Sequence, residues 1–373
     1  MTTQRGFMGA IAGLLVLMLL AGMSGLQAAV PEEHSTDLAR VSEITGFDAR
    51  READGEGCRF DEQFSLYLCQ PQRDATSPPL PASSGRAAVM ARLSDLAGVL
   101  FIPNSSAQTL MVFDAQTGEL IDERFIEFEL EETGTPIHAL IGPAGTVLVS
   151  DQIRNVVHEY TLAGDYLGVF APADGEDTSI MQNIRGMALR PNGHLLVSVG
   201  GGGNANAIAE FDLDGEFVGN FIANGSGGLN SPFDVYQRGE VDWLVSSINS
   251  NQVLSYALNN GASNGVFAPI SSFPQQIVQT ESGNVLVANF SGTIGVHEFT
   301  AGGELVGVYN PPGVSGNRGV YPLPNGNILT SSGGGVFEID RNGNLVETHY
   351  AGVGRFIQFV RGGRIFRDRF EEE

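Results

Sequence analysis

The sequence predicts an all-β fold, a β-propeller built from four-stranded blades. One phrase recurs six times at intervals of about 41 to 51 residues, and it contains only strand and turn signals. Each copy holds a strand that reads apolar-x-Glu-aromatic, or a looser form of it, as at residues 157–160 and 296–299. Repeats of this length that contain only strands stack as small sheets, and closing them in a ring removes their free edges.

Each copy opens with a tight hairpin turn, where glycine supplies the positive φ that such turns require. The turn glycines are Gly98, Gly145, Gly193, Gly239, Gly283 and Gly326. The strands that follow, such as residues 147–150 and 284–287, are nearly continuous apolar runs. Such runs are typical of strands buried on both faces, as between neighbouring blades. Each copy ends in an aromatic residue: Phe125, Phe170, Phe221, Phe267, Tyr309 and Tyr350.

The number of blades depends on the two ends of the chain. Residues 355–366 repeat the opening of a copy, while residues 41–45 and 64–68 resemble its third and fourth strands. We therefore predict seven blades, with the closing blade built from both termini. The alternative is six blades with the terminal strands packed outside the ring.

The predicted domains follow from this count. Residues 29–86 form an N-terminal segment that ends in a linker rich in Pro and Ser at 71–86, and that completes the closing blade if there are seven. Residues 87–366 form the propeller, and residues 367–373 form a charged tail.

Residues 1–28 are expected to be a signal peptide. One charge, Arg5, precedes an apolar run that is short for a membrane span, and small residues follow at the expected cleavage point. The mature protein is then exported to the periplasm or the extracellular space, with no membrane attachment.

In an oxidising compartment, two nearby cysteines such as Cys58 and Cys69 predict a disulfide across a hairpin.

The charge balance excludes several functions. All 20 basic residues are Arg, against 43 acidic residues, so the net charge is −23 and about −24 once the signal peptide is removed. Such a surface repels phosphate backbones and anionic lipid, which argues against nucleic-acid and membrane partners. A chain without Lys has no Schiff-base mechanism. The partners we expect are a small anionic ligand or a protein, bound by a monomer.

The copies resemble NHL repeats, for example at residues 184–198 and 207–221. The resemblance covers about 70% of the chain and implies the propeller fold. Proteins of this family include ligand-binding and scaffolding modules as well as lactonase- and lyase-type enzymes, so the resemblance leaves the activity open.

Three arginines share one position in the repeat. Arg185, Arg318 and Arg355 each stand eight residues before the turn glycine of their copy, in the loop that enters the first strand. Loops at this end of a blade surround the central channel, where ligands of propellers usually bind. We predict that the three guanidinium groups form an anion site. The alternative is that each pairs with an acidic residue or a carbonyl of its own or the next blade.

The loop after the second strand carries Asp151, Asn249 and Asn289 at roughly equivalent positions, and these are further candidate ligand-binding residues. Side-chain oxygens around a channel suit Ca²⁺, but Asp151 is the only carboxylate in this series, so Ca²⁺ is possible and no metal ligand is assigned. No catalytic residue is predicted. The expected function is an exported binding module with its site at the channel face; the alternative is a metal-dependent lactonase- or lyase-type enzyme.

Overall fold

The computed structural model describes residues 96–128, 134–271 and 273–362, residues 89 and 93, and the strands β1 (Cys58–Asp61) and β2 (Leu66–Cys69). The chain divides into two compact units, Met1–Gln72 and Arg73–Glu373. The predicted signal peptide at 1–28 and the predicted strand at 41–45 lie outside the described residues. Within these ranges, no helix has the length and apolar character needed to cross a membrane.

The first unit contains one described hairpin. Strands β1 and β2 pair as antiparallel neighbours, and Cys58 lies directly opposite Cys69 in their register. This register is compatible with the disulfide predicted from the sequence, which stays a prediction.

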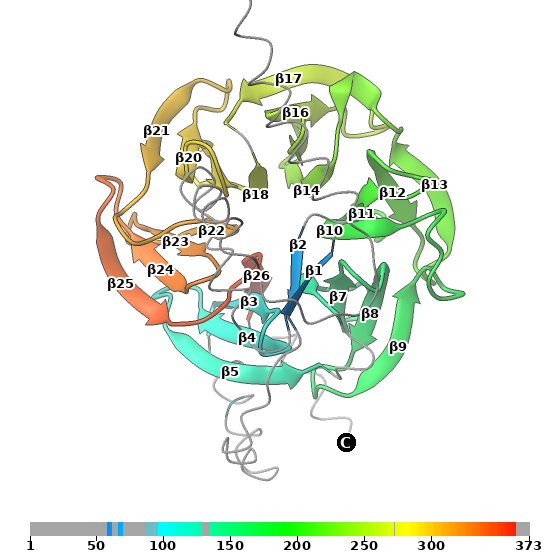
Figure 1. Ribbon diagram of the computed structural model, residues 1–373, viewed down its shortest axis with the longest axis horizontal. Coiled ribbons are helices and arrows are strands. Elements are labelled where there is room, and N and C mark those ends of the chain that lie inside the picture. The colour runs from blue at the N-terminus through cyan, green and yellow to red at the C-terminus, as the bar shows by residue number, and fades with distance from the viewer. Residues whose placement is uncertain are drawn as a thin grey trace, which may run out of the picture. The chain divides into compact units, whose positions relative to one another are not determined.

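The second unit is a six-bladed propeller of four-stranded antiparallel blades (Figure 1). From the centre outward, the blades contain the following strands: blade 1, β26 (Gln358–Arg361), β3 (Gly98–Asn104), β4 (Thr109–Asp114) and β5 (Leu120–Glu127); blade 2, β6 (Pro136–Ile141), β7 (Val147–Asp151), β8 (Val156–Tyr160) and β9 (Tyr166–Ala171); blade 3, β10 (Gln182–Leu189), β11 (Leu195–Gly201), β12 (Ala207–Phe211) and β13 (Phe217–Ile222); blade 4, β14 (Pro232–Arg238), β15 (Asp242–Ser247), β16 (Gln252–Tyr256) and β17 (Ser263–Pro269); blade 5, β18 (Pro274–Gln279), β19 (Val285–Asn289), β20 (Gly295–Phe299) and β21 (Leu305–Tyr309); blade 6, β22 (Gly319–Pro322), β23 (Ile328–Ser331), β24 (Val336–Ile339) and β25 (Leu345–Tyr350). A single-turn 3₁₀ helix, η1 (Ser226–Gly228), precedes β14.

The prediction of seven blades is wrong. The first copy of the repeat lacks an inner strand of its own, and β26 from the C-terminal end of the propeller supplies it by pairing with β3, with Val360 opposite Val99. This pairing satisfies the free edge of β3 and closes the ring at six blades. The six-bladed alternative was wrong in one detail, because the C-terminal strand lies inside the ring.

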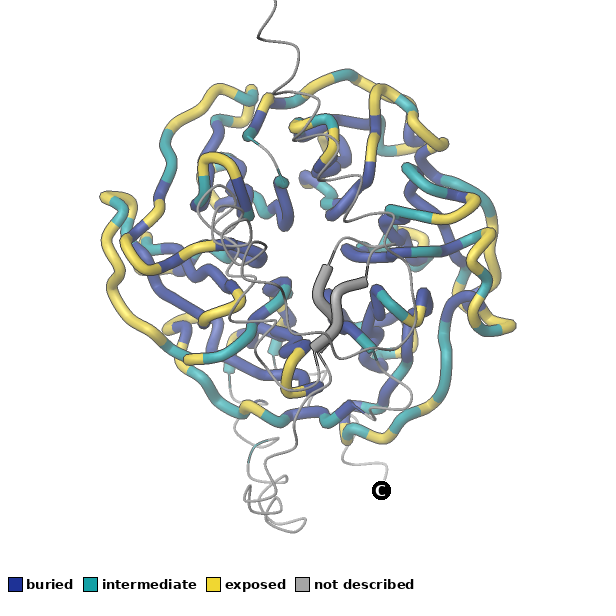
Figure 2. The backbone as a smooth tube through the Cα atoms, viewed as in Figure 1, coloured by how far each residue is buried: buried dark blue, intermediate teal, exposed yellow. Residues whose placement is uncertain are grey.

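The buried and exposed strands follow the predicted pattern. Strands β3, β7 and β15 are buried along their whole length, whereas β25 is mostly exposed. Figure 2 shows buried backbone toward the middle of the blades and exposed backbone along the rim. Apolar side chains of neighbouring blades pack against each other, as where Phe101 of blade 1 shares a cluster with Val149 of blade 2.

The repeated glutamate joins strands within a blade. In four blades it accepts a hydrogen bond from the residue that follows the turn glycine of the first hairpin. The pairs are Thr146–Glu159, His194–Glu210, Asn284–Glu298 and Asn327–Glu338. In these blades the glutamate of the repeat therefore links the third strand to the turn of the first hairpin.

Candidate functional site

The candidate site lies where the inner strands begin. The first residue of an inner strand pairs with the last residue of the second strand, as in Pro136–Asp151 and Pro274–Asn289. The loop that enters the inner strand and the loop that leaves the second strand therefore lie at the same end of the blade, as the sequence predicted. We call this end of the central channel the channel mouth.

Apolar side chains from several blades meet at the channel mouth. Ile137, Phe233, Ile248 and Phe356 form one buried cluster, with Phe273 packed against it. The ring centroid of Phe233 lies 5.8 Å from that of Phe356 and 5.8 Å from that of Phe273. Phe233 and Phe356 belong to blades 4 and 1, which face each other across the ring (Figure 1), so this contact spans the channel.

A polar layer adjoins this cluster. Three side chains accept a hydrogen bond from a backbone N–H of the next blade's inner strand: His138 from Met187 at 3.0 Å, Asp234 from Ile277 at 2.8 Å, and Gln276 from Val320 at 2.9 Å. In β10 and β18 the register shifts just before Met187 and Ile277, and such bulges leave a donor outside the ladder. The side chains satisfy these donors and link blade to blade.

Burial perturbs two of these side chains. It lowers the pKa of His138 to about 4, against a smaller opposing effect of its hydrogen bond with Gln358. Since Nδ1 accepts from Met187, His138 is neutral with its proton on Nε2, which donates to Gln358 at 2.9 Å. Burial raises the pKa of Asp234 to about 7, although backbone N–H groups of Ile277 and Val235 act in the opposite direction.

Arg185 is a buried cation with no carboxylate partner in the part of the chain that the structure describes. Its Nη1 donates to Ser231 Oγ at 2.9 Å and to the carbonyl of Pro232 at 2.8 Å, both in the neighbouring blade 4. The guanidinium carbon lies 4.7 Å from the ring centroid of Phe233. Among the described residues its Nε has no hydrogen-bond partner, and only 4% of the residue is exposed. Burial lowers its pKa to about 9.

Other arginines of the propeller do have acidic partners. Arg190 pairs with Glu210 at 2.6 Å, Arg238 with Asp242 at 2.7 Å, and Arg341 with Glu298 at 3.0 Å. Burying a charge without a partner of opposite charge costs free energy of folding. The burial of Arg185 away from any described carboxylate therefore requires an explanation other than the stability of the fold.

The glycine run near residue 200 packs directly on this cation. A Cβ atom at Gly200 would lie 2.6 Å from Nη1 of Arg185, and one at Gly202 would lie 2.5 Å from the carbonyl oxygen of Thr178. Gly202 also has a φ of +73°. Close approach of the backbone to the Arg185 side chain and to the carbonyl of Thr178 therefore accounts for glycine at positions 200 and 202.

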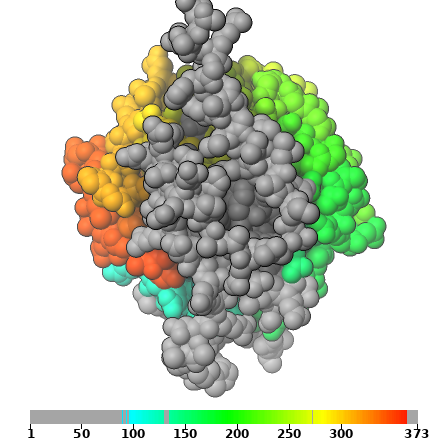
Figure 3. Space-filling model, in the orientation of Figure 1, coloured from blue at the N-terminus to red at the C-terminus, as the bar shows by residue number. Residues whose placement is uncertain are grey.

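The other two predicted arginines have different surroundings. The guanidinium carbon of Arg318 lies 5.7 Å from the ring centroid of Phe290 in blade 5. Arg355 donates from Nε to Ser105 Oγ of blade 1 at 2.8 Å. Arg318 enters blade 6 and Arg185 lies in blade 3. These two blades lie on opposite sides of the ring, as the orange and green surfaces in Figure 3 show. Arg318 and Arg355 thus enter adjacent blades, with Arg185 on the far side.

Asp151 holds its own loop together. Its oxygens accept hydrogen bonds from the backbone N–H groups of Gly134, Thr135, Ile153 and Arg154, and Oδ2 lies 3.3 Å from Nε2 of His158. The residue is fully buried. Burial alone raises the pKa of Asp151, but these bonds, led by that of His158, hold it below its ordinary value.

The two asparagines differ from each other. Asn289 is fully buried and donates from Nδ2 to Ser271 Oγ and to the carbonyl oxygens of Ser291 and Thr293. Asn249 is exposed and lies two residues beyond the end of β15, where Ser247 occupies the position equivalent to Asp151 and Asn289. The structure therefore does not place these three residues in one equivalent ring.

The sequence prediction missed the polar layer of His138, Asp234 and Gln276. The signal was one position away from the arginines: His138 and Gln276 stand seven residues before their turn glycines. Asp234 escaped this count because the glycine of blade 4, Gly239, is the first residue of the turn between Arg238 and Asp242, so it follows Asp234 after only five residues.

No protein-family model matches the sequence, and no curated protein matches it. Solved structures share the fold. A protein of unknown function from Bacteroides caccae is 17% identical, with a TM-score of 0.53 over 71% of this chain and 99% of that chain. A chain of the nidogen/laminin complex is 11% identical, with a TM-score of 0.55 over 70% and 98%. A streptogramin B lyase is 14% identical, with a TM-score of 0.46 over 67% and 79%.

At these identities the first two likenesses show the fold alone, and a TM-score below 0.5 adds no argument. The chain is a six-bladed β-propeller. A shared fold does not identify an activity, so the function has to be argued from the site.

Proposed function

We propose that this protein is an exported binding module that takes up a small organic anion at the channel mouth. Arg185 carries the proposal, because its guanidinium is buried and, among the described residues, its Nε has no hydrogen-bond partner and no carboxylate pairs with it. An anion at this position would supply the missing counter-charge. Charge-assisted hydrogen bonds to guanidinium are among the stronger polar interactions in proteins.

The surroundings of Arg185 favour an anion with an apolar body. Phe233 stacks under the guanidinium and continues into Phe273, which in turn lies 5.4 Å from Phe290 between ring centroids. Phe273 and Phe290 are half-buried, so part of their surface remains available. An aromatic carboxylate matches both the cation and these rings.

The state of Asp151 favours a binding module over a metal-dependent enzyme. A lactonase-type metal site needs carboxylate oxygens that face the channel, whereas those of Asp151 accept four backbone N–H groups and contact His158. Binding Ca²⁺ through Asp151 would break these bonds and unfold its loop. Tight stoichiometric Ca²⁺ binding that Asp151→Asn abolishes would support the enzyme instead.

Isothermal titration calorimetry with benzoate tests the proposal. Wild type should bind benzoate more tightly than acetate, and Arg185→Gln should weaken benzoate binding about 10- to 100-fold. Arg361→Gln is the matched control, since it removes one exposed arginine at the end of β26. Arg185→Lys keeps the positive charge but lacks the planar guanidinium group. It provides a second test of the site if Arg185→Gln does not fold. Equal benzoate binding by wild type and both Arg185 variants, or none by wild type, would refute the proposal.

A further inference from the structure

The outer half of blade 6 departs from the repeat at two positions. In blades 2 to 5 a glycine of the fourth strand lies opposite the repeated third-strand position, in the pairs Glu159–Gly168, Glu210–Gly219, Ser255–Gly265 and Glu298–Gly307. In blade 6 the residue opposite Glu338 is Glu347. Two residues further along the fourth strand, blades 2 to 5 carry Phe or Tyr, whereas blade 6 carries His349.

This change places two carboxylates on facing strands, an arrangement that is destabilising unless a cation lies between them. In blade 5 the corresponding Glu298 is neutralised by Arg341, which comes from the β24–β25 turn of blade 6. The equivalent turn of blade 1, residues 114–118, contains no basic residue. Blade 6 has an imidazole at this place instead.

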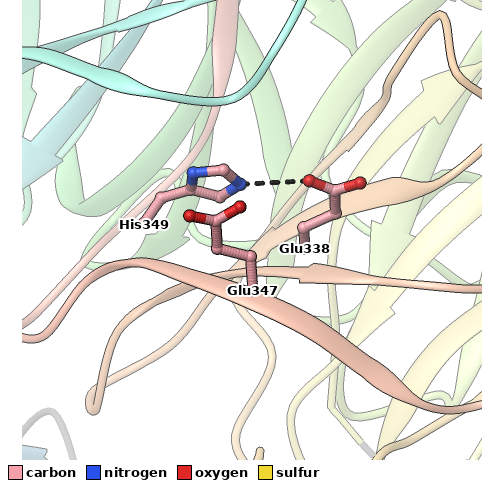
Figure 4. A group of neighbouring side chains, drawn as sticks. All are labelled: Glu338, Glu347 and His349. Atoms are coloured by element: carbon pink, nitrogen blue, oxygen red, sulfur yellow. Dashed lines mark hydrogen bonds and ion pairs between the residues drawn. The ribbon is translucent and has the colours of Figure 1, made fainter.

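The three side chains have the spacing of metal ligands. One ligand atom from each of Glu338, Glu347 and His349 lies within 4.8 Å of the others. His349 Nε2 lies 3.2 Å from Glu338 Oε2, and Glu347 reaches toward the same point from the neighbouring strand position (Figure 4). Bonds of about 2.1 Å to a tetrahedral ion place ligand atoms about 3.4 Å apart, so small rotations of exposed Glu347 suffice.

Neighbouring residues hold Glu338 in place and leave space beside His349. Glu338 Oε1 accepts hydrogen bonds from Nδ2 of Asn325 at 2.9 Å and of Asn327 at 2.5 Å, which leaves Oε2 directed at the imidazole. Amides that hold a carboxylate in this way are typical outer-shell partners of a metal ligand. Gly118 of blade 1 lies against His349, since a Cβ at Gly118 would be 3.0 Å from Nε2. A glycine there leaves room beside the ligand nitrogen.

We propose that Glu338 Oε2, His349 Nε2 and a carboxylate oxygen of Glu347 bind a Zn²⁺-type divalent ion on the outside of blade 6, beside blade 1. One imidazole with two carboxylates suits Zn²⁺, whereas Ca²⁺ prefers six to eight oxygen ligands. The site lies near the β22–β23 turn, at the opposite end of the blade from the channel mouth, so it does not depend on the proposed anion site.

Zinc titration of chelator-treated, full-length mature protein tests this assignment, with Co²⁺ absorption as a second readout. Wild type should bind one Zn²⁺ at this site, and Glu347→Gln should weaken that binding by at least about tenfold. The double variant Glu347→Gly with His349→Tyr copies blade 5, in which Gly307 faces Glu298 and Tyr309 donates to Glu298 Oε2 at 2.7 Å. It should therefore fold normally and lose the ion together with the visible Co²⁺ bands.

The matched control is Glu304→Gln, which removes an exposed carboxylate from the turn before β21 of blade 5. Zinc binding by this control should equal that of wild type. Zinc binding that survives the blade-5-like double variant would overturn the assignment. So would a wild type that binds no zinc after chelator removal, or a loss of equal size in Glu304→Gln.

Discussion

The buried carboxyl of Asp234 should make the stability of the propeller fall as the pH rises. Only 3% of Asp234 is exposed, and its oxygens accept hydrogen bonds from the backbone N–H groups of Val235 at 2.9 Å and Ile277 at 2.8 Å. Burial raises the pKa of Asp234 from an ordinary 3.8 to about 7. The folded state therefore keeps this proton at pH values where the unfolded chain has lost it.

The sign and size of the effect follow from proton linkage. Because the folded pKa is raised, the stability that Asp234 contributes is complete below about pH 4 and is lost as the pH rises through about 7. Between pH 5 and pH 8 the free energy of unfolding should fall by about 2.5 kcal/mol from this group. For a domain of this size that loss corresponds to a decrease in Tm of roughly 5–10 °C.

Asp234→Asn isolates this contribution from the many other titrating groups. The amide keeps one acceptor and cannot ionise, so the variant should gain about 2.5 kcal/mol relative to wild type between pH 5 and pH 8. Burial lowers the pKa of His138 to about 4, which acts in the opposite direction and costs stability as the pH falls below 6.5. That effect is common to both proteins and cancels in the comparison. Denaturant unfolding at both pH values measures the difference, and parallel pH profiles for wild type and Asp234→Asn would refute the reasoning.

Three further predictions concern the ring, the cation and the cysteines. Deleting residues 355–373 should lower Tm sharply, because it removes β26 and exposes the edge of β3, whereas deleting 363–373 leaves β26 intact and should change Tm little; similar melting of both truncations would contradict the closure described above. Gly200→Ala should cost about 1–3 kcal/mol in denaturant unfolding and weaken benzoate binding, because the new Cβ displaces the Arg185 guanidinium; unchanged stability would show that the loop moves freely. Thiol titration of unreduced, denatured mature protein should find no free thiol at Cys58 and Cys69, whose disulfide should add about 2–3 kcal/mol; two titratable thiols would exclude the bond.

The fold was largely predictable because each blade repeats the same local signals. Turn glycines, the buried second strand and the terminal aromatic residue all report on structure within one blade. The blade count was not predictable in this way, because it depends on one long-range pairing. Residues 358–361 read equally well as the start of a seventh blade or as the missing inner strand of the first. Only their pairing with β3 distinguishes the two.

The candidate site was predictable in part. The shared position of Arg185, Arg318 and Arg355 correctly indicated the channel end of the blades, but it contained no information on where each guanidinium points. Arg185 turns to Pro232 of the next blade and Arg355 to Ser105 of its own. Those directions depend on loop lengths and on which neighbour offers an acceptor. Similarly, the sequence indicated Asp151 as a candidate ligand-binding residue. Its hydrogen-bond partners are backbone N–H groups near it in the fold, and the residue types in a sequence do not show such bonds.

A repeat protein offers its own comparison for every position, and this comparison separates structural residues from functional candidates. A position filled alike in most blades serves the blade, as the third-strand glutamate does when it accepts from the residue after the turn glycine. When one blade has a different residue at such a position, and that residue destabilises the fold, the difference requires a cause other than stability. Among the residues that the structure describes, Arg185 has no carboxylate partner, whereas Arg190, Arg238 and Arg341 each have one. Glu347 stands where four blades have glycine. We propose that a bound ion of the opposite sign compensates the charge in each case: an anion at the channel mouth for Arg185, and a divalent cation on blade 6 for the facing carboxylates of Glu338 and Glu347.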